Sequence, residues 1–185
     1  MDNFSITQLG KPLDESLYTI DKENKIFYSK EWGLTLYFKN SYGWTFTIDG
    51  GGTLITGGSC TIKTRGNYTF DTGNHCTFNT GADCIFNTSD YCTFNTGNRC
   101  TFDTGLDCTF YSGNDCTFNT GTGCTFKIDW DCTFTTGESC VFSLNDFHTH
   151  NFKSYDEHSI ILDRIDKKRY ILTKEFIAWQ KIKNG

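Results

Sequence analysis

Apolar and polar positions alternate along most of the chain in a pattern that repeats every eight residues. The ten cysteines are separated by 8 or 16 residues, so all of them share one phase of this repeat. In residues 92–99, a typical octet, the order is Cys, Thr, Phe, Asn, Thr, Gly, Asn, Arg. In this phase, fourteen octets run from Leu36 to Thr149, where the last has two extra residues, and a fifteenth follows around Phe152.

Octet positions 1, 3 and 5 fall on one face of an extended chain, and positions 2 and 4 fall on the other. Position 3 is Phe in twelve of the fourteen octets, position 2 is Thr in eleven, position 5 is usually Thr, and position 6 is Gly in eight. Each octet therefore predicts a short strand with its Cys and Phe facing inward. We expect the glycine at position 6 to supply the positive φ that turns the corner.

The perimeter of the coil decides how many octets form one turn. Eight residues at about 3.3 Å each give roughly 26 Å, too little to enclose phenylalanines between walls that pack about 10 Å apart. Two octets give a flattened coil of 16 residues with two parallel sheets, and three give a triangular coil of 24. We expect two, because flat walls let the Phe and Cys columns meet. The predicted fold class is all-β, a parallel β-solenoid (β-roll or β-helix) of 8-residue repeats.

The predicted core is a ladder of cysteines and phenylalanines along the inner faces of both sheets. Its members are Cys60, Cys76, Cys84, Cys92, Cys100, Cys108, Cys116, Cys124, Cys132, Cys140, Phe46, Phe70, Phe78, Phe86, Phe94, Phe102, Phe110, Phe118, Phe126, Phe134 and Phe142. Stacked cysteines on parallel strands would hold their Cβ atoms about 4.8 Å apart, whereas a disulfide prefers roughly 3.5–4.5 Å. We therefore expect free thiols that pack as small core residues.

Both ends of the solenoid need a cap, because a bare end offers unpaired strand edges to another copy. Each end carries a predicted hairpin, at 18–28 and at 160–172. Thr173 can begin a short helix that runs through Lys183 and buries Trp179. The expected parts are an N-terminal cap at 1–35, an octapeptide-repeat β-solenoid at 36–157, and a C-terminal hairpin and helix cap at 158–185.

Composition and charge agree with this fold and narrow the function. With 28 Thr against 2 Ala and 1 Val, a helical bundle is disfavoured. The sequence shows no transmembrane segment and no secretory signal, so we expect no membrane association and folding in a reducing cytosol. The net charge is −5. Residues 163–185 carry seven basic and three acidic side chains, so the body is acidic and we expect it not to bind nucleic acid directly.

Two groups of residues resemble metal sites. Histidines where the repeat breaks register are weak candidate zinc ligands, with Cys132 or Cys140 nearby: His148, His150 and His158. Acidic residues at octet position 8 suggest calcium, but the Gly-Gly-x-Gly-x-Asp repeat of calcium-binding β-rolls is absent: Asp83, Asp107, Asp115 and Asp131. A polar rim and solvated turns explain both groups, so we predict no metal and no cofactor.

No catalytic motif is present, and we predict that the protein is not an enzyme. Asp71 and Asp103 would lie two coils apart on one wall, near the spacing of glycosidase carboxylates, but a solvated acidic stripe explains them. Apolar residues that break the polar pattern are the candidate contact surface: Tyr91, Leu106, Tyr111 and Trp130. Trp179 in the basic tail is a candidate anchor on an acidic partner.

The Cys-Thr-Phe-x-Thr-Gly octapeptide resembles a family of repeat proteins found in tailed bacteriophages, large DNA viruses and some bacteria. The stretches at 152–156, 159–163 and 170–175 also look like that family's C-terminus, so the resemblance covers nearly the whole chain. It implies the solenoid fold. It carries over no catalytic or ligand-binding residue, since a solenoid is a scaffold that hosts many roles.

These observations lead us to expect a non-enzymatic structural or interaction protein. The leading hypothesis is a bacteriophage virion component, a rigid rod in a fibre, decoration or tail appendage that is made and folded in the host cytoplasm. Its expected partners are other virion proteins, a host surface receptor and further copies of itself. Two alternatives remain. One is a soluble, cytoplasmic acidic binding protein, either a DNA mimic or an inhibitor of a host enzyme. The other is an ice-binding solenoid, although the rank beside the outer threonines mixes Asn, Asp, Lys and Tyr111.

Overall fold

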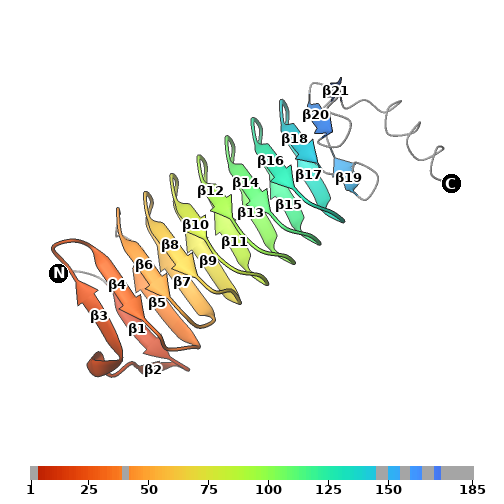
Figure 1. The fold of residues 1–185 in the computed structure, drawn as a ribbon. Coiled ribbons are helices and arrows are strands. Elements are labelled where there is room, and N and C mark those ends of the chain that lie inside the picture. Colours follow the sequence, from red (N-terminus) through yellow and green to blue (C-terminus); the bar gives the residue numbers. More distant parts are fainter. Residues whose placement is uncertain (1–3, 39–41, 145–149, 155–158, 164–168, 172–185) are drawn as a thin grey trace.

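The computed structural model describes the chain except residues 1–3, 39–41, 145–149, 155–158, 164–168 and 172–185. The described residues form the predicted parallel β-solenoid, a stack of coils with one strand of each coil in each of two facing sheets (Figure 1). The one described helix is a 3-10 turn, η1 (Glu15–Leu17), whose first residue follows the capping side chain of Asp14. The fold class predicted from the octet pattern is confirmed.

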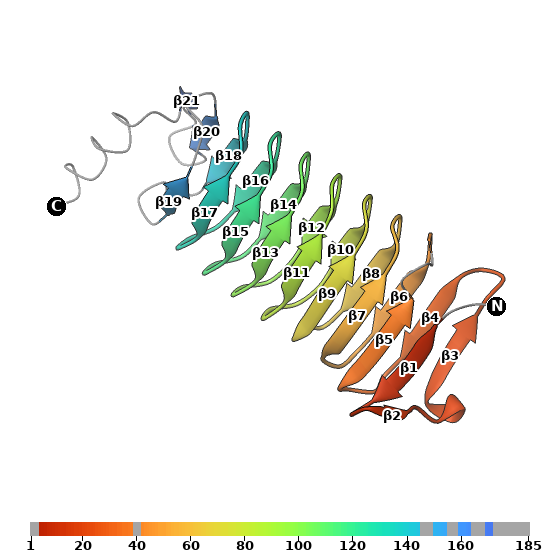
Figure 2. The same cartoon turned by 180° about the vertical axis from the view of Figure 1, so that it is seen from behind.

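Sheet A has ten strands within the described residues. Their spatial order is β19 (Asn151–Ser154), β17 (Thr133–Thr136), β15 (Thr117–Thr120), β13 (Thr101–Thr104), β11 (Ile85–Thr88), β9 (Tyr68–Thr72), β7 (Gly52–Thr56), β5 (Leu34–Phe38), β1 (Ser5–Gln8) and β2 (Lys11–Pro12). The strands from β5 to β19 pair in parallel, and β1 and β2 close this sheet with antiparallel pairs. Figure 2 shows β2 at the end of the stack from behind.

Sheet B has eleven strands within the described residues. Their spatial order is β21 (Arg169–Ile171), β20 (Ile160–Asp163), β18 (Val141–Leu144), β16 (Thr125–Ile128), β14 (Thr109–Ser112), β12 (Thr93–Asn95), β10 (Thr77–Asn79), β8 (Thr61–Thr64), β6 (Thr45–Ile48), β4 (Ile26–Ser29) and β3 (Tyr18–Asp21). Both ends of this sheet are antiparallel hairpins, β3 with β4 and β20 with β21. The two hairpins predicted from the sequence are confirmed.

The register shows that each coil contains two octets. Phe78 pairs with Phe94, and Phe94 pairs with Phe110, so neighbouring strands of a sheet are 16 residues apart in the sequence. The octet between them contributes its strand to the other sheet, where Phe86 pairs with Phe102. This pairing settles the choice between two and three octets per coil in favour of two.

From Phe70 to Phe142 the phenylalanines form a continuous ladder of rings in the core. Rings of the same sheet stack, as Phe94 does on Phe110 with centroids 4.9 Å apart and planes 3° apart. Rings of opposite sheets meet edge to face, as Phe94 does with Phe102 at 5.2 Å and 78°. Both are favourable aromatic geometries. Every cysteine and phenylalanine of the predicted ladder is at most 1% exposed, so the predicted core is confirmed.

The corner is built differently from the prediction. None of the eight glycines at octet position 6, all of them described, has a positive φ. The left-handed residue is at position 8, for example Asp83 with φ 60° and Arg99 with φ 55°. The glycine instead allows close approach of the backbones, since a Cβ added to Gly97 would lie 2.9 Å from the nitrogen of Ala82 in the preceding coil. The expectation that position 6 needs positive φ was therefore wrong.

The first octet is also shifted relative to the prediction. Leu36 was assigned to octet position 1, but it pairs with Leu54, which is at position 3, and Phe38 pairs with Thr56 at position 5. Leu34 takes position 1, opposite Gly52. The phase breaks because the stretch from Leu34 to Gly43 is two residues longer than an octet, as at 140–149.

Strands of both predicted caps join the parallel stack. β4 pairs in parallel with β6, which places Phe27 opposite Phe46 in the core. At the other end β20 pairs in parallel with β18, and Ile161 lies opposite Phe142. The stack therefore extends beyond 36–157 on both sides. The predicted helix after Thr173, with Trp179, lies outside the described residues.

Candidate interaction surfaces

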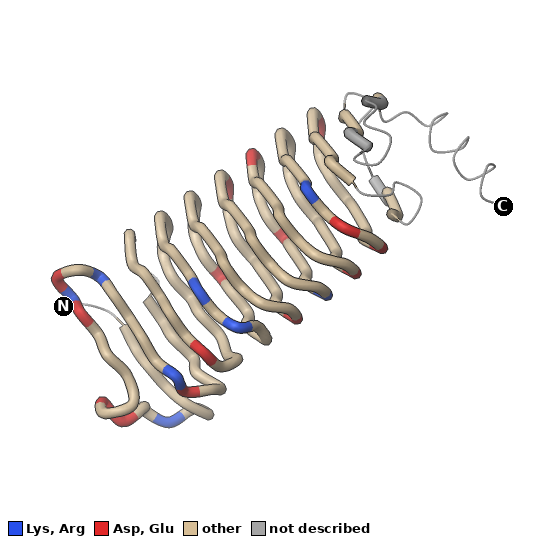
Figure 3. Tube along the Cα trace, in the orientation of Figure 1, with Lys and Arg blue, Asp and Glu red and all other residues tan. Residues whose placement is uncertain are grey.

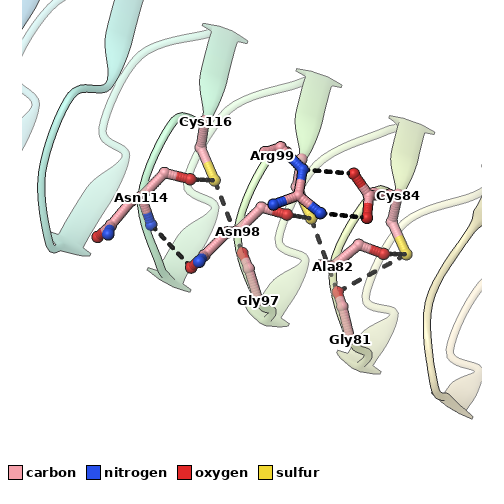
Figure 4. A network of polar contacts seen from close by, with 10 residues as sticks. Gly81, Ala82, Cys84, Gly97, Asn98, Arg99, Asn114 and Cys116 are labelled. Atoms are coloured by element: carbon pink, nitrogen blue, oxygen red, sulfur yellow. Dashed lines mark hydrogen bonds and ion pairs between the residues drawn. The ribbon is translucent and has the colours of Figure 1, made fainter.

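The thiols form two columns inside the solenoid, one along each edge of the coils. One column contains Cys60, Cys76, Cys92, Cys108, Cys124 and Cys140, and the other contains Cys84, Cys100, Cys116 and Cys132. Each thiol lies against backbone carbonyls at a corner. The Sγ atom of Cys116 donates to the carbonyl of Gly97 at 3.7 Å and to that of Asn114 at 3.5 Å (Figure 4).

These contacts explain why position 1 is Cys and not a plain aliphatic residue. The corner turns carbonyl oxygens inward, and a thiol is both small and a weak hydrogen-bond donor. Hydrogen bonding with Cys116, reinforced by burial, raises the pKa of Cys100 to about 11. The same two causes, with Cys100 as the partner, raise the pKa of Cys84. All ten cysteines are free and buried, so they act as core residues.

The corners form two edges of the rod. Edge 1 contains the corners that lead from sheet A to sheet B, and edge 2 contains those that lead from sheet B to sheet A. On edge 2 an Asx side chain at octet position 7 caps the next coil. The Oδ1 atom of Asn98 accepts from the backbone nitrogen of Asn114 at 3.0 Å, and that of Asn114 accepts from the nitrogen of Trp130 at 3.3 Å.

Edge 2 also holds three of the four aspartates considered for calcium, and one of them, Asp83, is ion-paired. Both carboxylate oxygens of Asp83 accept from the guanidinium of Arg99, one coil further on, at 2.8 and 2.7 Å (Figure 4). This hydrogen bonding lowers the pKa of Asp83. Asp115 and Asp131 lie at the equivalent corners of edge 2, and Asp107 lies on edge 1. Among the described residues, no group of three or more His, Cys, Asp or Glu side chains could hold a metal ion.

The carboxylates considered as a catalytic pair lie on the outer face of sheet A. The register places Asp71 opposite Asn87 and Asn87 opposite Asp103, so the two acids are two strands apart, as expected. Asp103 accepts a hydrogen bond from the Nδ2 atom of Asn119 at 3.0 Å. From Asp71 to Asn119 this rank on sheet A therefore alternates acids and amides, and Asn87 separates Asp71 from Asp103.

The outer threonines form a rank on each sheet. On sheet B six successive strands carry Thr at octet position 2: Thr45, Thr61, Thr77, Thr93, Thr109 and Thr125. The rank beside it is chemically mixed: Thr47, Lys63, Asn79, Asn95, Tyr111 and Lys127. The regular array is therefore one residue wide.

The predicted contact residues are exposed but do not gather on one surface. Tyr91 and Leu106 lie on edge 1, Trp130 lies on edge 2, and Tyr111 lies on the outer face of sheet B, with exposed fractions of 37–49%. The Nζ atom of Lys127 lies 5.9 Å from the centre of the Tyr111 ring. Trp179 is outside the described residues.

His150 lies against strand β17 of sheet A, near the C-terminal end of the stack. Its Nδ1 atom accepts from the backbone nitrogen of Cys132 at 3.3 Å, and its ring centre is 5.7 Å from that of Phe134. The imidazole therefore takes part in closing the end of the core. His148 and His158 lie outside the described residues.

Sequence reasoning missed a hollow on edge 1. It has a volume of about 470 Å³. Its lining residues are Tyr42, Thr56, Gly57, Gly58, Ser59, Asp71, Thr72, Gly73, Asn74 and His75. The signal in the sequence was the Gly57-Gly58 pair directly after a strand, together with the longer stretch at 34–43 that carries Tyr42. Four exposed apolar residues of the N-terminal cap were also missed: Leu9, Leu17, Ile26 and Trp32.

Charged residues occur along the length of the stack, and acidic ones outnumber basic ones in its coils (Figure 3). Between Thr45 and Leu144, all described, ten acidic side chains stand against four basic ones, a net charge of −6.

Within the described residues, no helix has the length and apolar character needed to cross a membrane.

Together, the fold and the surfaces define a class of protein: a β-solenoid with an interlocked core of aromatic rings and thiols and a polar, acidic exterior. No family model matches this chain, no curated protein matches it, and no solved structure matches it.

Proposed function

We propose that this protein is a non-enzymatic rigid rod that acts as a structural component of a bacteriophage particle. The observation that carries the proposal is the ladder of phenylalanine rings from Phe70 to Phe142, in which rings stack along each sheet and meet edge to face between the sheets. Bending such a rod would separate rings that are close-packed, and close-packed interiors resist deformation. A fixed separation between its two ends is what a fibre, decoration or tail appendage requires.

The particle assignment also rests on the resemblance that we proposed from the sequence, between the octapeptide and repeat proteins of tailed bacteriophages. Folding in the host cytoplasm fits ten buried free thiols. In this role one end of the rod would anchor on other virion proteins, and its edges or the other end would face outward toward a host surface receptor. Further copies of the chain are additional candidate partners.

Mass spectrometry of purified particles of the bacteriophage that encodes this chain tests this proposal. We expect the chain in the particles at a fixed ratio to the major capsid protein after density-gradient purification. Recovery only in the soluble fraction, in a complex with one host protein, would reject the particle assignment.

The second candidate is a soluble acidic binding protein, a DNA mimic or an inhibitor of a host enzyme. It is favoured by the net charge of −6 between Thr45 and Leu144, which would attract a basic, DNA-binding surface. A competition assay in which the purified rod displaces DNA from a host protein would support it. A third candidate, ice binding, is favoured by the threonine rank on sheet B, and absence of thermal hysteresis would reject it.

A further inference from the structure

The hollow on edge 1 has a backbone floor and aromatic walls. Gly57 and Gly58 are buried, and the nitrogen of Gly73, in the next coil, donates to the carbonyl of Gly57 at 3.2 Å. A Cβ added to Gly58 would lie 2.7 Å from the carbonyl oxygen of Asn74. The floor therefore depends on glycine, and within the described part of the chain no side chain fills the space above it.

Tyr42 forms one wall and is held in place by its backbone. Its carbonyl accepts from the Nζ atom of Lys25 at 3.0 Å, and the nitrogen of Gly43 donates to the carbonyl of Gly58 at 3.2 Å. The Cε1 atom of the ring lies 3.5 Å from the position that a Cβ of Gly58 would occupy. The ring is thus next to the floor while the side chain stays 63% exposed.

His75 forms the opposite wall and is supported from outside the hollow. Its ring stacks on that of Tyr91, with centroids 5.0 Å apart and planes 8° apart. Both residues are at octet position 8, where the left-handed backbone points their side chains out of edge 1. Two exposed aromatic groups therefore flank a floor that offers only backbone atoms.

The remaining groups at the hollow are polar. Asp71 contributes a carboxylate, Asn74 a carboxamide and Ser59 a hydroxyl, and all three residues are exposed. A pyranose ring matches this arrangement, because its C–H face packs on an aromatic side chain while its hydroxyls need carboxylate, amide and hydroxyl partners. We propose that the hollow between Tyr42 and His75 binds an uncharged saccharide unit.

Size and charge narrow the ligand further. A volume of about 470 Å³ falls within the range of small-molecule sites, roughly 300–1,000 Å³. Among the residues that line the hollow, all of them described, none is Lys or Arg, and Asp71 carries a negative charge. The lining therefore offers no Lys or Arg side chain to pair with a phosphate or carboxylate group, and the ligand class that fits it best is a neutral sugar. This inference is independent of the particle assignment, which particle mass spectrometry tests separately.

A titration of the ¹⁵N-labelled full chain followed by two-dimensional NMR tests the proposal. The probes are methyl α-glucoside, methyl α-mannoside, methyl β-galactoside and N-acetylglucosamine, each at millimolar concentration, with N-acetylneuraminic acid as the charged comparison. We expect at least one neutral sugar to shift the amide signals of Gly58 and Gly73 in a saturable way. We expect the charged sugar to bind more weakly.

Variants of exposed residues separate this site from general surface binding. Tyr42→Ala and Asp71→Asn should each weaken binding roughly tenfold or more, as expected when an aromatic or charge-assisted contact is lost. The matched controls are Tyr111→Ala on sheet B and Asp103→Asn in the same rank as Asp71, and neither should change the affinity. No response to any neutral sugar, or equal losses in the site and control variants, would overturn the proposal.

Discussion

The central coils, residues 76–142, and the first coils, residues 26–75, have the same architecture with different cores. In the central coils the inward residues at octet positions 1 and 3 are uniformly Cys and Phe. In the first coils several of these positions hold other residues: Leu34, Leu36, Trp44, Gly52, Leu54, Ile62 and Tyr68. Both regions continue the same two sheets. The coil is therefore specified by the alternation of inward and outward positions, and no single side chain is required.

The first coils show how side-chain volume is redistributed between paired residues of neighbouring coils. Gly52 and Tyr68 both occupy octet position 1 and are paired in sheet A, so a residue without a side chain lies next to a large ring. The Tyr68 ring stacks on Phe70 with centroids 5.5 Å apart. Close packing of the interior accounts for this exchange, because a core conserves total volume better than it conserves individual residues.

The largest expected effect comes from a phenylalanine in the regular region. Phe102 lies against four other rings, at 4.7–5.2 Å between centroids: Phe86, Phe94, Phe110 and Phe118. Phe102→Ala should lower the free energy of unfolding by about 3–5 kcal/mol. Urea denaturation followed by circular dichroism measures this change.

Leu54→Ala in the first coils is the matched comparison for Phe102→Ala. It should cost about 2–3 kcal/mol, because fewer buried atoms are removed. An unchanged unfolding midpoint for Phe102→Ala would contradict the role given to the ring ladder.

The second prediction concerns Tyr68, which stands at octet position 1 of the first coils where the central coils have Cys. Tyr68→Cys restores the common residue at octet position 1, yet it should destabilise the protein by roughly 2–4 kcal/mol, because Gly52 cannot fill the space that the ring leaves. The urea midpoint reports the change.

The reciprocal variant, Cys84→Tyr, places a large ring beside the cysteines of the regular region and should cost about 1–3 kcal/mol by overpacking. Stabilisation by either variant would show that volume is not exchanged between neighbouring coils.

The coil and its core could be predicted from the sequence because the eight-residue repeat is unusually regular. Cysteines in a single phase and phenylalanines two residues later leave only one set of inward positions. The prediction was wrong where two physical causes give the same residue preference. Glycine at octet position 6 is explained equally well by a positive φ and by close approach of two backbones, and only the folded structure distinguishes them, through the φ angles and the distances between neighbouring coils.

The candidate surfaces were harder to predict than the core. Exposed aromatic residues could be read from the octet, but octets alternate between two sheets, so their distribution over different faces became visible only in the coil. The hollow depends on Tyr42, which belongs to a stretch that departs from the octet. A repeat pattern gives no position for residues that break it.

The third prediction uses the thiols, which are present from Cys60 onward and absent from the coils before it. Hydrogen bonding with Cys116, then burial, holds the pKa of Cys100 at about 11 in the folded chain, against about 8.5 in an unfolded one. The unfolded thiol therefore loses its proton first as pH rises. The contribution of the Cys100 thiol to the free energy of unfolding is fully present below about pH 8.5 and is lost between there and pH 11. At pH 10 the loss from this residue alone is about 2 kcal/mol.

Urea denaturation at pH 7 and pH 10 measures this loss, with Cys100→Ala as the control. The variant should start from a lower stability and lose less of it on going to pH 10. An equal loss in both proteins would show that the Cys100 thiol does not carry the effect.

The smallest expected effect compares two asparagine side chains, one at a corner of the coil and one on the exposed face of a sheet. The side chain of Asn98 accepts from the backbone of the next coil at 3.0 Å, so Asn98→Ala leaves a backbone N–H without its partner and should cost about 0.5–1.5 kcal/mol. Asn95→Ala removes the same side chain from the exposed face of β12 and should change stability by less than about 0.5 kcal/mol. Hydrogen exchange at the Asn114 amide gives a local readout, and it should accelerate in Asn98→Ala only. Equal protection of that amide in both variants would show that the Asx side chain at octet position 7 does not hold successive corners together, leaving the strands alone to set the stacking.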